Sequence, residues 1–243
     1  MSPLPAWRGG RLGIVMMSAL GDAIHVLPLL DALKRHAPST HVTWVLQLGP
    51  AELVKGHPHV DDTVIFRRHL GPGAYADVRR QLRDRPFDLV LGLQVYFKAG
   101  LVTWLTRAPV KLGFDLARAR DANWLFTTHR IPPHAPQHVQ DQYFEFLDAM
   151  AVPHGEARWN LRPAADERAA AQKLVEPAQG PLVGFVVATS KPDKNWLPQR
   201  FAEVATRLQA EVGARCVLLG GTTPLEVEAA RAIEAATSAA PIN

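Results

Sequence analysis

The chain has 243 residues and a formal net charge of +4. This length suits one large or two modest domains, and the 47% hydrophobic and 21% charged residues are ordinary for a soluble globular protein. The positive charge favours anionic partners, but no dense Lys/Arg tract or aromatic-basic motif indicates nucleic acid, which leaves an acidic small molecule or an anionic lipid headgroup.

The first predicted strand and helix lie between Arg11 and Arg35. The apolar run 12–17 predicts a buried parallel strand, and residues 18–21 interrupt it. Apolar residues then recur at the spacing of one helix face, at Ile24, Leu27, Leu30 and Leu33. Further strands are predicted at 41–47, 62–66, 87–93 and 111–114, and helices at 51–55, 75–84, 98–105 and 137–150. This alternation is typical of a parallel sheet with helices on both faces.

A second alternation follows a proline- and glycine-containing linker at 152–163. Its predicted elements are a helix at 165–175, a strand at 182–187, a helix at 198–212, a strand at 215–219 and a helix at 225–237. Two strands do not make a self-sufficient doubly wound sheet. We therefore predict an α/β protein with a Rossmann-like domain at 1–155 and a partial second Rossmann-like domain at 165–243.

Three features of the sequence bear on the cellular compartment of the protein. The single cysteine, Cys216, cannot form an intrachain disulfide, which favours a reducing environment. No apolar run approaches the roughly 18 residues that a membrane-spanning helix needs. The apolar N-terminal stretch resembles a signal peptide, but Asp22 and the amphipathic pattern after it indicate a folded strand–helix unit instead. We expect a cytoplasmic protein.

Asp22 is the first candidate functional residue. In an open α/β sheet, ligands bind beyond the carboxyl ends of the strands, and Asp22 follows the first strand closely. The alternative is that Asp22 only caps the helix, a position that aspartate fills readily. The turn lacks the G-x-G-x-x-G pattern of a dinucleotide site.

Several motifs resemble those of glycosyltransferase family 9, the ADP-heptose:lipopolysaccharide heptosyltransferases. Residues 18–28 contain a Ser-x-x-Gly-Asp turn followed by His-x-x-Pro, and residues 194–201 contain Lys-x-Trp-x-x-x-x-Phe. Between and after them lie the similar segments LGLQVYFKAGLVTWL, GFDLARARDANWLF, QHVQDQYFEFLDAM and VLLGGTTPLEVEAA. Each segment is moderately specific, and their order over residues 11–243 strengthens the resemblance.

The resemblance implies a GT-B fold and an inverting transferase that needs no metal and no cofactor, with a nucleotide-sugar as co-substrate. It assigns Asp22 as the base that removes the acceptor proton, a role that direct displacement requires. It places Thr189, Ser190, Lys194 and Glu226 at the donor, where hydroxyls and a cation would stabilise the leaving diphosphate. Without the resemblance, Lys194 is a solvated lysine and Thr189 and Ser190 cap a helix. The sequence contains no Asp-x-Asp motif, in agreement with a metal-free class.

The acceptor that the resemblance implies is the anionic inner core of lipopolysaccharide. Arginine and lysine suit its carboxylates and phosphates. The residues assigned to acceptor binding are Lys98, Arg118, Arg120, His138, Arg67 and Arg68. For each of them, the simpler alternative is a solvent-facing side chain. We also expect the basic surface of the protein to hold it loosely at the cytoplasmic face of the inner membrane.

Two departures from the family pattern leave alternatives open. Met16 and Met17 stand where the family has a basic residue, and the family's Asp-Thr-Gly-x-x-His segment does not occur in these residues. The chain is therefore either a truncated glycosyltransferase or a non-catalytic remnant that binds an anionic glycan or glycolipid. A third hypothesis, an unrelated nucleotide-binding sheet protein, is disfavoured by the order of the motifs.

Overall fold

The computed structural model describes residues 4–163, 165–176, 180–189, 192–239 and 241–243. The chain divides into two compact units, of which the first ends at Arg162 and the second begins at Pro163. This division falls at the end of the segment 152–163 that the sequence indicates as a linker. The predicted donor residue Ser190 lies outside the described residues.

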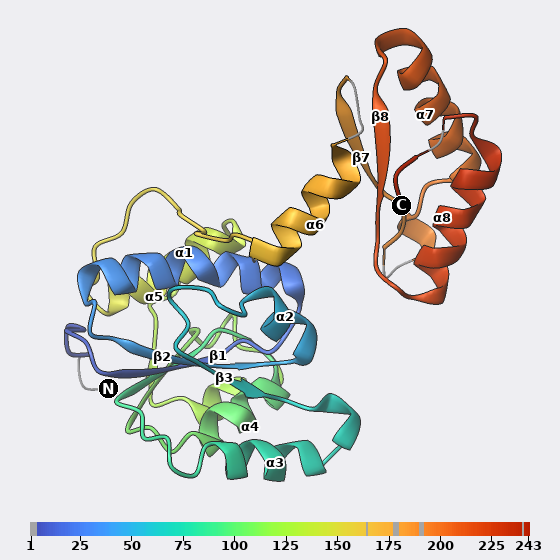
Figure 1. The fold of residues 1–243 in the computed structure, drawn as a ribbon. Coiled ribbons are helices and arrows are strands. Elements are labelled where there is room, and N and C mark those ends of the chain that lie inside the picture. Colours follow the sequence, from blue (N-terminus) through green and yellow to red (C-terminus); the bar gives the residue numbers. More distant parts are fainter. Residues whose placement is uncertain (1–3, 164, 177–179, 190–191, 240) are drawn as a thin grey trace. The chain divides into compact units, whose positions relative to one another are not determined.

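The first unit is built on a parallel sheet of six strands (Figure 1). The strands are β1 (Arg11–Val15), β2 (His41–Leu46), β3 (Asp62–Ile65), β4 (Leu89–Gly92), β5 (Val110–Gly113) and β6 (His129–Arg130). Their order across the sheet is β3-β2-β1-β4-β5-β6, and every neighbouring pair is parallel. The α/β class with a parallel N-terminal sheet is confirmed.

Helices cover both faces of this sheet. The helices are α1 (Leu20–His36), α2 (Leu48–Leu53), α3 (Gly73–Gln81), α4 (Phe97–Leu105) and α5 (Val139–Ala149). In Figure 1, α1 and α5 lie on one face and α3 and α4 on the other. Successive strand residues point to opposite faces, so Ile14 packs in the core under α1 and α5 while Val15 packs in the core over α3 and α4. Burial on both faces explains why these strands are continuous apolar runs.

The structure corrects several predicted boundaries. β1 ends at Val15, so residues 16–19 form the turn, and α1 begins at Leu20. α2 begins at Leu48, three residues before the helix expected at 51–55. The edge strand β6 was not predicted, because two residues carry no periodicity that a sequence pattern can reveal. Short 3₁₀ helices at Arg68–Leu70 and Asn123–Phe126 were also missed.

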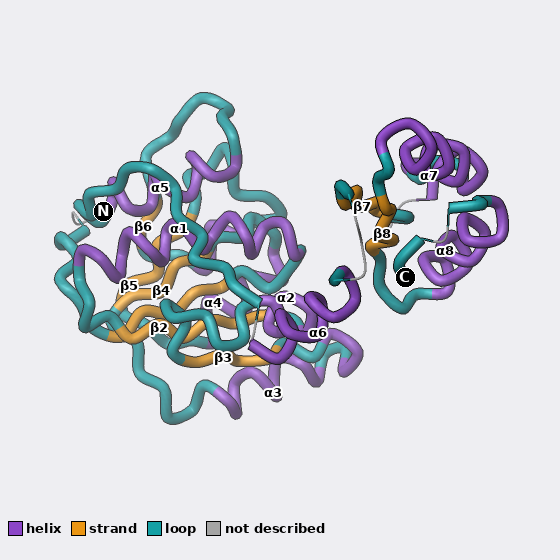
Figure 2. Tube along the Cα trace, turned by 45° about the horizontal axis from the view of Figure 1, so that its top comes forward, coloured by secondary structure: helices purple, strands orange, loops and turns teal. Residues whose placement is uncertain are grey.

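The second unit contains β7 (Leu182–Val186) and β8 (Arg215–Leu219), which pair in parallel (Figure 2). Its helices are α6 (Ala165–Val175), α7 (Pro198–Val212) and α8 (Pro224–Ala236). Phe185, Ala205, Cys216 and Ile233 form a core between the strands and helices α7 and α8. Ile242 forms a parallel bridge to Val217, so a third segment joins this sheet.

The other face of the second sheet is open within this unit. Val186 is 65% exposed and Leu219 is 47% exposed, whereas Phe185 is buried. A doubly wound sheet covers both faces with helices, so the described part of this unit has one covered face. Among the described residues, no helix is long and apolar enough to cross a membrane.

Candidate active site

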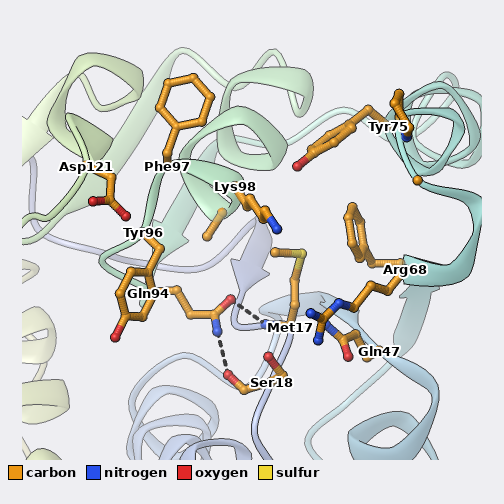
Figure 3. Close-up of a pocket in the computed structure, with 14 residues that line it drawn as sticks. Met17, Ser18, Gln47, Arg68, Tyr75, Gln94, Tyr96, Phe97, Lys98 and Asp121 are labelled. Carbon is orange, nitrogen blue, oxygen red and sulfur yellow. Dashed lines mark hydrogen bonds between the residues drawn. The ribbon is translucent and has the colours of Figure 1, made fainter.

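The strand order creates a ligand crevice at the carboxyl edge of the first sheet. The chain runs from β1 outward through β2 to β3 and then returns to β4 on the other side of β1, so the loops after β1 and β4 leave in opposite directions. Such a switch point is where open α/β sheets bind ligands. A cavity of about 820 Å³ lies there (Figure 3). Ser18, Gln47, Arg68, Lys98 and Asp121, which line it, follow β1, β2, β3, β4 and β5 respectively.

Gln94 links the loops that follow β4 and β1 on the two sides of this crevice. Its Oε1 accepts a hydrogen bond from the Met17 backbone N–H at 3.0 Å, and its Nε2 donates to the backbone carbonyl of Ser18 (Figure 3). One side chain from the loop after β4 therefore holds two consecutive residues after β1. Gln94 was not predicted to be a site residue, because a lone glutamine in a loop has no distinguishing pattern.

Two cationic side chains enter a largely apolar cavity. The Lys98 amine and the Arg68 guanidinium point into the space between Met17, Gln47 and Tyr75 (Figure 3). Within the described part of the chain, neither cation has an ion-pair partner. Unpaired cations beside apolar walls favour an anionic ligand, because the lining itself offers them little charge compensation. The structure thus brings together two of the predicted acceptor residues, Lys98 and Arg68.

Asp22 occupies the third position of α1, so the alternative in which it is the N-cap residue is wrong. Ala19 is the N-cap residue, and its backbone N–H donates to Asp22 Oδ2 at 3.0 Å. The carboxylate therefore stabilises the helix start from inside the first turn. Asp22 is half-buried and is not among the residues that line the 820 Å³ cavity, although Ser18 in the preceding turn is.

Helix α5 lies beside the Asp22 turn. Burial, and secondarily the negative charge of Asp22, raise the pKa of the Tyr143 phenol, which keeps this side chain protonated. The His25 and His138 rings meet edge to face, with centroids 5.3 Å apart. His138 is the N-cap of α5, where its Nδ1 accepts the Gln140 backbone N–H at 3.2 Å. The predicted acceptor residue His138 thus has a structural role and lies near the α1 start.

Arg118 is engaged in ion pairs, unlike the free acceptor-binding cation that we expected. Its guanidinium pairs with Asp115 and, at 2.7 Å, with Glu145, and it donates to the Pro132 carbonyl at 3.1 Å. Hydrogen bonding to Glu145 raises the pKa of Arg118. This arrangement joins the loop after β5 to α5, which favours a structural role.

The two remaining arginines differ from one another. Arg67 pairs with the buried Asp77 at 2.6 Å, and this hydrogen bond lowers the pKa of Asp77. Arg67 is therefore also held by a protein carboxylate. Arg120 is exposed, and its backbone N–H donates to the Val95 carbonyl at 2.8 Å, which places it next to the cavity residue Asp121. Arg120 stays a predicted acceptor residue at the rim of the cavity.

The predicted donor residues follow β7 and β8. The Thr189 backbone N–H donates to Asn195 Oδ1 at 2.7 Å, and Lys194 is exposed at the end of a 3₁₀ helix, Pro192–Lys194. Glu226 forms a capping box with Thr223, whose hydroxyl donates to Glu226 Oε2 at 2.6 Å. Hydrogen bonding to Thr223 lowers the pKa of Glu226. The Thr-x-x-Glu pattern of this box is a sequence signature of a helix N-terminus.

The described residues contain no group of three or more His, Cys, Asp or Glu side chains arranged to hold a metal ion. Glu226 lines a cavity of about 240 Å³ together with Gly220 and Gly221, on the carboxyl side of β8. In each unit, the predicted residues thus gather after the strands.

A parallel sheet with a cavity at its carboxyl edge defines the first unit as a Rossmann-like ligand-binding domain. Residues 75–243 match glycosyltransferase family 9 (heptosyltransferase), and the chain belongs to this family. The family resemblance seen in the motifs is therefore confirmed.

Relatives of known name agree with this assignment. The chain is 28% identical over 194 residues to the lipopolysaccharide core heptosyltransferase OpsX of Haemophilus influenzae, covering 80% of this chain and 55% of the relative. It is 28% identical over 238 residues to lipopolysaccharide heptosyltransferase 1 of Escherichia coli K12, covering 92% of this chain and 72% of the relative. The chain thus spans little more than half the length of the first of these relatives.

Solved structures share the fold. A glycosyltransferase family 9 protein from Veillonella parvula matches with a TM-score of 0.82 at 23% identity, covering 96% of this chain and 68% of that one. Escherichia coli heptosyltransferase WaaC with ADP-2-deoxy-2-fluoro heptose matches with a TM-score of 0.74 at 26% identity, covering 93% of this chain and 73% of that one. These likenesses confirm the GT-B-like fold class.

Proposed function

We propose that the protein transfers a heptose, or a similar sugar, from a nucleotide-sugar such as ADP-heptose to the inner core of lipopolysaccharide. The observation that carries the proposal is the placement of Asp22 in the first turn of α1, directly after the β1–α1 turn whose Ser18 lines the cationic cavity. Relatives named as lipopolysaccharide heptosyltransferases support the substrate class, and the WaaC structure with an ADP-heptose analogue supports the donor.

Asp22 acts as the general base in this proposal. Its Oδ2 accepts the Ala19 N–H, which orients the carboxylate and leaves Oδ1 to take the proton from an acceptor hydroxyl. The hydroxyl oxygen then bonds to the anomeric carbon while the bond from that carbon to the diphosphate oxygen breaks. Attack opposite the leaving diphosphate inverts the anomeric centre. One proton moves to Asp22, and the bonding electrons leave with the diphosphate.

The developing charge on the diphosphate needs compensation. Lys194, exposed in the loop after β7, is the cation that we assign to this charge, with the neighbouring Thr189 as a polar partner. A lysine in this position performs the electrostatic role that a metal has in other glycosyltransferases. Together with the absence of an Asp-x-Asp motif from the sequence, this supports a reaction without metal or organic cofactor.

The acceptor binds in the 820 Å³ cavity in this proposal. Lys98 and Arg68 face acidic groups of the core sugars there, and Arg120 contacts them at the rim. The apolar walls formed by Tyr75 and Phe97 suit the non-ionic faces of the sugar rings. An acceptor attached to lipid places the protein in the cytoplasm, at the inner face of the membrane.

The decisive experiment measures sugar transfer by the full-length protein and its Asp22→Asn variant, with ADP-heptose and a lipopolysaccharide inner-core acceptor. We expect kcat to fall by about 10²–10⁴ because the base is lost, while ADP binding stays at the wild-type level. Asp148→Asn, an exposed aspartate of α5, is the matched control and should retain activity. Unchanged turnover in Asp22→Asn would refute the role of Asp22. Acceptor binding without transfer by the wild-type protein would favour the non-catalytic alternative.

A further inference from the structure

A second cavity lies between α3 and α4, away from the strand ends. It has a volume of about 530 Å³, and its lining includes Arg79 and Arg83 from the α3 side and Leu101, Trp104, Leu105 and Arg107 from the α4 side. We call these six residues the basic groove. A smaller cavity of about 240 Å³ adjoins it, shares Arg79, Trp104, Leu105 and Arg107, and adds Lys111.

The basic groove carries an excess of positive charge. Arg79, Arg83 and Arg107 are exposed and have no ion-pair partner within the described ranges. Of the nearby carboxylates, Asp77 is buried and pairs with Arg67 and Arg80, and Asp84, which follows Arg83, lines a different cavity. No acidic side chain lines either cavity. The groove therefore presents a net positive field to solvent.

An apolar strip runs between these arginines. Trp104 is 58% exposed at the end of α4, and Leu101 and Leu105 lie half-buried beside it. An exposed tryptophan next to leucines costs free energy in water and usually marks a contact surface. Tryptophan with flanking arginines is the side-chain combination that favours the boundary between lipid headgroups and acyl chains.

We propose that the basic groove binds the surface of a bilayer that contains anionic phospholipids. The guanidinium groups contact lipid phosphates, and Trp104 inserts its ring among the headgroups. The apolar strip favours a bilayer over nucleic acid, whose phosphate backbone would use the arginines and leave the strip uncovered.

The position of the groove agrees with this partner. Tyr75 lines both the basic groove and the 820 Å³ cavity at the strand ends, so the two cavities adjoin within the first unit. A lipid-linked acceptor lying in the bound membrane would thus approach the cationic cavity along the face formed by α3 and α4, past Tyr75. This last step rests on the proposed function, whereas membrane binding itself does not.

The test is sedimentation of the full-length protein with vesicles of phosphatidylcholine alone or with added phosphatidylglycerol. We expect binding only to the vesicles with phosphatidylglycerol, weakening as salt is added. Arg79→Glu with Arg83→Glu should weaken this binding at least about tenfold. The matched control, Arg158→Glu with Arg162→Glu, makes the same change in net charge at two exposed arginines outside the groove and should bind as the wild type does.

A second variant pair, Trp104→Ala with Arg107→Gln, tests the opposite side of the groove and should also weaken vesicle binding. Absence of wild-type binding to phosphatidylglycerol vesicles, or an equal loss in the control pair, would overturn the proposal. So would groove-dependent binding of an RNA oligonucleotide without vesicle binding. Transfer to a detergent-dispersed acceptor should survive the groove substitutions, so failure of the membrane proposal and failure of the transferase proposal give different results.

Discussion

Arg118 and Glu145 form a two-point ion pair, with Nη1–Oε1 at 2.8 Å and Nη2–Oε2 at 2.7 Å. The pair joins the loop after β5 to helix α5. The two side chains are only 17% and 12% exposed, and Asp115 completes the cluster. Burial acts to raise the pKa of Asp115, but hydrogen bonds from Arg118 and neighbouring backbone groups outweigh it and lower this pKa. The cluster therefore contains one cation between two carboxyl groups.

We expect Arg118→Ala to lower the free energy of unfolding by about 3 kcal/mol, because it leaves Asp115 and Glu145 without their cation. Urea unfolding followed by circular dichroism measures this change. Arg120→Ala removes a nearby exposed arginine and should change the free energy of unfolding by less than about 0.5 kcal/mol. Equal stability of the two variants would contradict the structural role of Arg118.

Lys194→Ala should weaken ADP binding about tenfold or more, because a charged hydrogen bond to the diphosphate would be lost. Isothermal titration calorimetry of the full-length protein with ADP measures this effect. Lys173→Ala, an exposed lysine of α6, is the control and should leave the dissociation constant unchanged. A wild-type dissociation constant in Lys194→Ala would remove this lysine from the donor site.

Lys98→Ala and Arg68→Ala should each raise KM for the acceptor, by about tenfold, with a smaller effect on ADP binding. Both cations point into the cavity, and we propose that they contact acidic groups of the acceptor. Steady-state transfer kinetics at saturating donor separate KM from kcat. Lys55→Ala changes an exposed lysine outside the cavity lining and should have no effect. If acceptor KM stayed at its wild-type value in both cavity variants, the acceptor would have to bind elsewhere.

Local patterns predicted most of the elements that build the fold. The strand at 215–219 and the helices at 165–175 and 198–212 agree with the structure residue for residue. Such elements are long, periodic or bounded by proline and glycine, so nearby residues determine them. Short elements such as β6 depend on a partner strand, and their own residues give no signal.

The residues of the candidate site were likewise predicted only in part. The motif around Asp22 placed that carboxylate in the turn after the first strand, but its position inside the helix depends on a hydrogen bond to Ala19. Lys98 and Arg68 were predicted from the family resemblance and do lie at one cavity. Gln94 and Tyr75 were not predicted, because their importance comes from contacts with segments distant along the chain.

The sequence by itself determined the alternation of strands and helices, the family and the strand–helix unit that contains Asp22, since each of these depends on residues close to one another along the chain. Tertiary structure alone decided which cations are free. Arg118 and Lys98 look alike as isolated basic residues, yet one is held by Glu145, 27 positions away, and the other faces an open cavity. Charge compensation acts through space, so only the folded chain distinguishes a structural arginine from a ligand-binding cation.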